Sequence, residues 1–111
     1  MLHYMHLHHK PFVLIQNGIK TIEMRLNDEK RQLIHVGDQI QFDDRSSSNT
    51  CMTEVIALHH YPDFQELYQH FDKEVLGYLK EEEAKPEDME KYYSKEEQKQ
   101  YGVLGIALKL L

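Results

Sequence analysis

Hydrophobic and polar residues alternate over short segments in the first half of the chain, and turn residues separate these segments. The alternation predicts strands at residues 2–8, 21–26, 39–42 and 50–61. The last of these is long enough to bend or to contain a β-bulge. Short strands joined by tight turns are typical of a small barrel or a curled sheet.

A helix is predicted between the first two strands. Pro11 suits the first turn of a helix, where no N–H bond is lost, and Gly18 suits the position after its end. Between them, Phe12, Leu14 and Ile15 would form the apolar side of the helix.

The second half of the chain changes to a helical period. The Pro-Asp pair at 62–63 opens a helix, and short helical segments follow. The charge-dense segment 80–91 is predicted to be a solvated connection. Ser94 and Glu97 form a capping box for a further short helix. The apolar segment 103–111 closes the chain as a strand that we expect to be central in the sheet.

Length and composition indicate one α+β domain over residues 1–111. A chain of 111 residues has room for a single core, and 41% hydrophobic with 29% charged residues is the composition of a globular protein. We therefore predict a small mixed β-barrel of five to six strands with short helices packed at its ends.

The charge is distributed unevenly. The first 61 residues carry 6 basic and 7 acidic side chains, whereas the remaining 50 carry 7 and 12, which together give the net charge of −6. An acidic domain is poorly suited to general, salt-driven coating of RNA or DNA. Any polynucleotide would have to meet a local cationic patch, which only the first half could supply.

The cysteine and histidine content predicts neither a metal site nor a cofactor. Cys51 is the single cysteine, so no internal disulfide can form. The eight histidines lack zinc-finger spacing, and surface histidines are the simplest interpretation, with a cluster of three from separate strands as the alternative. The first residues make a poor signal peptide and no apolar run is long enough to cross a membrane, which favours the cytoplasm.

The segment from Lys20 to Arg25 carries the candidate chemistry. In a strand, Thr21, Glu23 and Arg25 share one face, and this face could simply be half exposed. Alternatively, this face could form a polar pocket. The Arg25 guanidinium would then bind phosphate or carboxylate with two of its nitrogens, and Lys20 would add a point charge. Glu23 would hold the two cations or carry a proton.

The order of these motifs resembles the ASCH domain, a branch of the PUA-like β-barrels. The resemblance rests on the pattern Gly18, Lys20, Glu23 and Arg25, on the Gly-Asp turn at 37–38, and on the closing segment YGVLGIALKL. It implies a barrel whose cleft is lined by the Lys–Glu–Arg segment and the start of the first helix, and a function in binding RNA or modified nucleosides.

Some members of this family are hydrolases, and one subgroup deacetylates acetylcytidine with a lysine-activated threonine. Lys20 matches the lysine of that subgroup, but Glu23 stands where its threonine would be, and Thr21 lies two positions earlier. The resemblance therefore favours ligand binding over catalysis.

The sequence thus predicts a module that binds a short single-stranded RNA or a modified nucleoside through Lys20, Thr21, Glu23 and Arg25. Base stacking could come from Tyr92, Tyr93 or Tyr101, or these side chains could pack under one end of the barrel. The alternatives are a hydrolase of an acylated nucleoside or of RNA, with Lys20 as base and Glu23 as proton relay, and a protein-interaction domain that uses the acidic residues 80–98. The sequence gives no oligomeric state.

Overall fold

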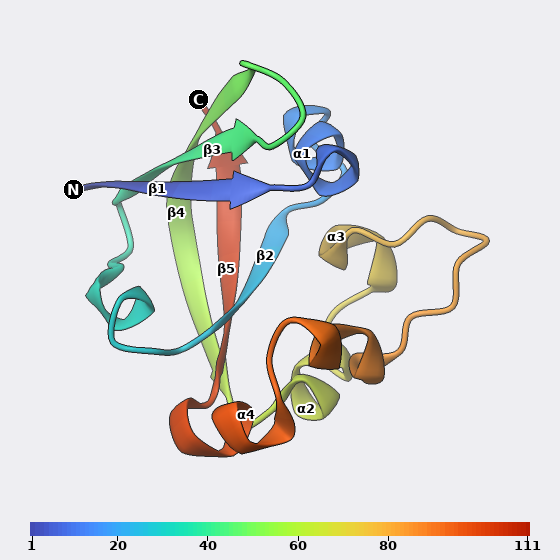
Figure 1. Ribbon diagram of the computed structural model, residues 1–111. Helices are drawn as coiled ribbons and strands as arrows, with labels where there is room; N and C mark the ends of the chain where they lie inside the picture. The colour runs from blue at the N-terminus through green and yellow to red at the C-terminus, as the bar shows by residue number, and fades with distance from the viewer.

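Five strands form one mixed sheet in the order β1-β3-β4-β5-β2, as the computed structural model shows for all residues 1–111 (Figure 1). β1 pairs with β3 in parallel, and every other pair is antiparallel. The strands are β1 (Leu2–Leu7), β2 (Ile22–Leu26), β3 (Gln39–Asp44), β4 (Thr50–Tyr61) and β5 (Val103–Leu110).

The sheet curls because β4 is long and irregular. Its first half pairs with β3, its pairing with β5 extends to Tyr61, and the register shifts between Val55 and Ala57. Such a bulge bends the strand and increases its twist. β1 and β3 consequently lie across one end of β4 and β5 (Figure 1). The predicted bulge and the predicted small mixed barrel of the α+β class are confirmed, with five strands in a half-barrel.

Short helices occupy the connections. They are α1 (His9–Gln16), α2 (Phe64–Tyr68), α3 (Lys73–Leu76) and α4 (Lys95–Tyr101), with 3₁₀ turns η1 (Arg31–Leu33) and η2 (Pro86–Lys91). None of these helices is long and apolar enough to span a membrane. α1 begins two residues before Pro11, which its first turn tolerates because the N–H groups there have no helical partner.

The predicted caps in the second half are present. The Asp63 carboxylate accepts from the Glu66 backbone N–H, and Ser94 and Glu97 form the reciprocal capping box. The segment 80–91 is less solvated than predicted. Pro86 opens the turn η2, and Met89 on this turn is buried in an apolar cluster with residues of β2, α2, α3 and β5.

Two apolar clusters lie on opposite faces of the sheet. Alternate residues of β5 belong to each: Leu104 and Ile106 lie in the cluster under α1, and Val103 and Ala107 in the cluster covered by α2, α3 and η2. A strand buried on both faces reads as a continuous apolar run, which explains the closing segment. β5 is an interior strand, flanked by β4 and β2, whereas β2 is at the edge of the sheet. This edge carries the candidate site.

Candidate functional site

Three charged side chains meet on and beside β2. Lys20 and Glu23 are each only 5% exposed. Nζ of Lys20 lies 3.3 Å from Oε1 of Glu23, and Nε of Arg25 donates to Oε2 of Glu23 at 2.7 Å. The carboxylate therefore sits between two cations, as a buried anion requires.

The Lys20 ammonium is enclosed by backbone. Besides the contact with Glu23, Nζ donates to the carbonyl of Ile22 at 2.8 Å and to the carbonyl of Leu76 at 2.9 Å. An ammonium group has three donors, so these partners use all of them. Gly77 follows in a left-handed conformation, and a Cβ on it would lie 3.0 Å from Cδ of Lys20.

Burial and ion pairing act in opposite directions on these groups. Burial lowers the pKa of Lys20, and the nearby Glu23 offsets this only in part. For Glu23, burial alone would raise the pKa, but Arg25 and Lys20 together hold it below its ordinary value. Burial also opposes the charge of Arg25, but Glu23 outweighs it and raises the pKa of the guanidinium. Glu23 and Arg25 are therefore firmly ionised at neutral pH.

Arg25 connects the two edges of the sheet. Its Nη2 donates to the carbonyl of His6 on β1 at 3.3 Å, while Nε is engaged with Glu23. Nη1 makes no hydrogen bond within the protein, and nearby Tyr93 also raises the pKa of Arg25. The guanidinium is thus held through Nε and Nη2, and its third nitrogen, Nη1, is available to bind a ligand.

These side chains form the floor of a pocket of about 530 Å³, which we call the basic pocket. It lies between the end of β1, the start of α1, β2, the end of α3 and η2. Its lining residues are His6, Leu7, His8, Lys10, Pro11, Lys20, Glu23, Met24, Arg25, Arg45, Leu76, Gly77, Tyr78, Glu82, Met89, Lys91, Tyr92 and Tyr93.

The basic pocket concentrates positive charge in an acidic protein. Five lysine and arginine side chains line it against two carboxylates, in a chain with net charge −6. Lys10 is paired with Glu82 at 2.7 Å. Arg45 makes no side-chain hydrogen bond or ion pair, and Lys91 makes no ion pair.

An exposed aromatic ring stands at the rim of the basic pocket. Tyr92 is 51% exposed, and Nζ of Lys91 lies 5.2 Å from the centre of its ring. The His8 ring centroid is 6.4 Å from the same ring. Cationic groups beside an accessible ring are a combination that suits a planar, negatively charged ligand.

Of the four predicted site residues, Lys20, Glu23 and Arg25 line the basic pocket, and Thr21 does not. Thr21 borders a separate hollow of about 190 Å³. It precedes β2 and is fixed by its backbone, which donates to the Val75 carbonyl and accepts from the Leu108 N–H. Among the tyrosines, Tyr92 and Tyr93 line the basic pocket, whereas Tyr101 lines a different hollow.

Sequence reasoning missed Gly77, Leu76 and Arg45. A glycine after an apolar helical segment signals the end of a helix, but it does not reveal that a lysine from a distant segment packs against it. Arg45 lies in the β3–β4 connection, where a charged residue is ordinary, and nothing in its local sequence points to a pocket.

Several of the histidines contact acidic side chains. Nε2 of His3 lies 2.8 Å from Asp38, and Nδ1 of His9 lies 2.8 Å from Asp44. No three histidine, cysteine, aspartate or glutamate side chains are arranged to hold a metal ion.

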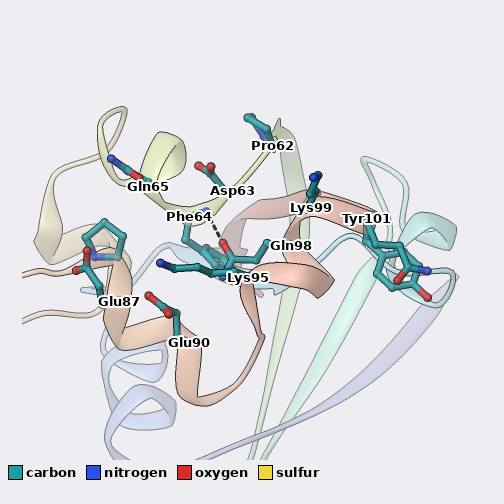
Figure 2. Close-up of a pocket in the computed structure, with 13 residues that line it drawn as sticks. Pro62, Asp63, Phe64, Gln65, Glu87, Glu90, Lys95, Gln98, Lys99 and Tyr101 are labelled. Carbon is teal, nitrogen blue, oxygen red and sulfur yellow. Dashed lines mark hydrogen bonds between the residues drawn. The ribbon is translucent and has the colours of Figure 1, made fainter.

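A second and larger hollow lies among the helices, and we call it the helical hollow (Figure 2). It measures about 710 Å³ and is bordered by residues of α2, η2 and α4. Gln98 is its buried polar residue: Oε1 accepts from the Phe64 N–H at 3.1 Å, and Nε2 donates to the Tyr93 carbonyl at 3.2 Å. The amide therefore joins the start of α2 to the connection between η2 and α4.

Comparison with known proteins places this arrangement in a family. Curated proteins give no match. Among solved structures, the hypothetical protein PH0355 is 30% identical, with full coverage of both chains and a TM-score of 0.80. Protein PF0455 from Pyrococcus furiosus is 32% identical over 100% of this chain and 98% of that one, with a TM-score of 0.72.

The ASCH protein from Zymomonas mobilis shares the fold at 15% identity and a TM-score of 0.68, over 97% of this chain and 66% of that chain. The model of the ASCH domain matches residues 5–111. That match includes every residue of the basic pocket, the end of β1 and all of the other four strands, so the chain belongs to the ASCH domain family.

Proposed function

We propose that the protein is a small nucleotide- or RNA-binding module and that the basic pocket is its binding site. The ASCH family resembles RNA-binding domains, which supports the ligand class. The observation that carries the proposal is the charge of the pocket: in a chain of net charge −6, cationic side chains and an exposed tyrosine gather at one pocket. Elsewhere the acidic surface would repel phosphate.

The pocket offers a partner for each part of a nucleotide. Lys91, which has no acidic partner, would meet the phosphate of the bound nucleotide, and the ring of Tyr92 would stack on its base. Arg25 would direct its open nitrogen at a base edge or a phosphate oxygen.

Lys20 and Glu23 have a positioning role in this proposal. The ammonium of Lys20 has used its donors on Glu23 and two carbonyls, so its contribution reaches the ligand through Glu23. Glu23 in turn fixes the plane of the Arg25 guanidinium. A fork held in this way loses little freedom when a ligand binds.

Binding of ribonucleoside monophosphates at low salt, measured by calorimetry, tests the proposal. Replacing Tyr92 with alanine should weaken binding by about 1–3 kcal/mol, the usual value of one base stacked on an aromatic ring. The matched control is Tyr4→Ala, because Tyr4 is 56% exposed, against 51% for Tyr92, and lies outside the pocket. Absence of binding across the four nucleotides and short RNAs, or equal losses in both variants, would reject the proposal.

Hydrolysis of an acylated nucleoside is the second candidate function. The lowered pKa of Lys20 favours it, since a neutral amine can act as a base. Against it, the Thr21 hydroxyl lies outside the pocket and the Lys20 donors are engaged. Release of cytidine from acetylcytidine, abolished in a Lys20→Met variant that remains folded, would establish the hydrolase. No release by the wild-type protein would exclude this substrate.

A further inference from the structure

The basic pocket continues into a second depression on the surface. This depression, the hairpin hollow, measures about 540 Å³ and is formed by residues 43–50 of the β3–β4 hairpin together with His6. His6 and Arg45 line both spaces. No hydrophobic side chain lines the hairpin hollow, whereas the basic pocket contains apolar and aromatic ones.

Arg45 is held at the boundary between the two spaces. It directly follows β3, and its backbone N–H donates to the Leu7 carbonyl at the end of β1 at 2.9 Å. The hairpin therefore runs beside the start of α1, as Figure 1 shows. The backbone of Arg45 is fixed while its guanidinium has no partner in the protein.

The acidic residue next to Arg45 is turned inward. The Asp44 side chain is fully buried and accepts hydrogen bonds from the Ser46 N–H at 3.0 Å, the Ser46 hydroxyl at 2.8 Å and the Ser47 hydroxyl at 3.0 Å. Asp43 is 27% exposed and lies 4.0 Å from Nδ1 of His6. One partly exposed carboxylate thus accompanies Arg45 and His6 at the boundary.

The remaining surface of the hairpin hollow is uncharged and polar. Ser47, Ser48, Asn49 and Thr50 are exposed and carry hydroxyl and amide groups. Such groups contact phosphate and ribose oxygens, and a surface with no apolar or aromatic side chain offers no stacking partner for a base. The hairpin hollow therefore suits the sugar–phosphate backbone, and the basic pocket suits a base.

We propose that the ligand of the basic pocket is a nucleotide within an RNA strand, and that the strand continues past Arg45 and His6 along the hairpin hollow. The inference rests on the proposed function, because it extends the same site. It distinguishes a strand from a free nucleoside or mononucleotide, which would occupy the basic pocket alone.

Binding of uridylates of increasing length tests this extension. UMP, the dinucleotide and the trinucleotide are titrated by calorimetry at several salt concentrations. The wild-type protein should bind the trinucleotide several-fold more tightly than UMP. In Arg45→Gln the ratio of the two affinities should fall towards one. The salt dependence of trinucleotide binding should also weaken by about 0.7 in log–log slope, the value of one phosphate contact on a single strand.

Two further variants separate this effect from a general change of charge. Lys30→Gln removes the same charge from a residue outside all the hollows and should leave the length ratio unchanged. Ser48→Glu places a carboxylate in the hairpin hollow and should reduce the ratio as Arg45→Gln does.

The failure of this extension is distinguishable from failure of the proposed function. Equal affinity of the wild-type protein for UMP and the trinucleotide, or an unchanged length ratio in Arg45→Gln, would overturn the extension while UMP binding supports the pocket. Absence of binding by UMP and by the longer oligomers would reject both.

Discussion

The basic pocket and the helical hollow differ in how their polar groups are used. The helical hollow is the larger, at about 710 Å³ against 530 Å³. Its buried polar residue is the neutral Gln98, whose amide links the start of α2 to the connection between η2 and α4. In the basic pocket, two ionisable side chains, Lys20 and Glu23, are buried against each other, and Nη1 of the neighbouring Arg25 makes no hydrogen bond within the protein.

The difference shows that buried charge is a better guide to a site than volume. Burying an ion costs several kcal/mol before its partners compensate, on the order estimated for buried ion pairs. The packing of the helices requires no buried ion, since the neutral amide of Gln98 makes the polar contacts in the helical hollow. The contrast between the two regions can be tested by perturbing each of them, starting with the largest expected effect.

Glu23→Gln should have the largest effect on stability. The substitution leaves Lys20 and Arg25 buried without their anion, which costs about 3–5 kcal/mol of unfolding free energy. Urea denaturation measures the loss. Glu90→Gln, at an exposed position of the helical hollow, should change stability by no more than about 0.5 kcal/mol. Similar losses of unfolding free energy in the two variants would contradict the proposed difference between the basic pocket and the helical hollow.

Gly77→Ala should destabilise the protein by about 2–4 kcal/mol, because backbone strain and overpacking against Lys20 add together. Gly77 has φ +107°, and its Cβ would meet Cδ of Lys20 at 3.0 Å. Gly37→Ala is the matched control, since Gly37 has φ +95° and nothing within 4 Å. It should show the strain alone. Urea denaturation measures the loss of unfolding free energy in both variants. A loss in Gly77→Ala no greater than in Gly37→Ala would mean that the Lys20 side chain moves aside at no cost.

Gln98→Ala should cost about 1–3 kcal/mol, because the Phe64 N–H is left buried without an acceptor. Gln100→Ala, at an exposed position of the same helix, serves as the control and should be nearly neutral. Thermal denaturation of both variants gives the comparison. A neutral Gln98→Ala would indicate that water enters the helical hollow and replaces the amide.

The pH dependence of stability should be the subtlest difference. Glu23 has a folded pKa below its ordinary value of 4.5, so the unfolded chain binds more protons in the window between the two values. Stability from this group is present above about pH 4.5 and is lost as the pH falls through the folded pKa. Urea denaturation of the wild-type protein and of Glu23→Gln over this range should show a shallower acid loss in the variant. If the unfolding free energies of the two proteins fell in parallel with pH, the acid-induced loss of stability would come from carboxyl groups other than Glu23.

Local patterns in the sequence predict the fold well and the site only in outline. The alternation at 21–26 predicts a strand that carries Glu23 and Arg25, and in the structure β2 spans Ile22–Leu26 with both side chains lining the basic pocket. The length of β4 predicts its bulge. These features depend on neighbouring residues, whose spacing in the chain sets their direction in space.

The environment of each charge depends on segments far away in the chain. Lys20 is enclosed because Leu76, 56 residues later, supplies a carbonyl and Gly77 leaves room for the lysine side chain. Thr21 lies two residues before Glu23, so alternation predicts both on the same face. Thr21 precedes the strand, however, and its backbone hydrogen bonds hold it outside the basic pocket. Alternation predicts the direction of a side chain only within the strand itself.

The hydrogen bond from Arg25 to the carbonyl of His6 has a mechanical consequence. β1 and β2 are the first and last strands of the sheet order, so this bond bridges the open seam of the half-barrel. A side chain, not a backbone ladder, spans the seam at that point. Under the proposed function, a ligand that binds the Arg25 guanidinium would compete with this bond. Binding at the basic pocket would then change how firmly β1 and β2 are joined, and with it the closure of the half-barrel.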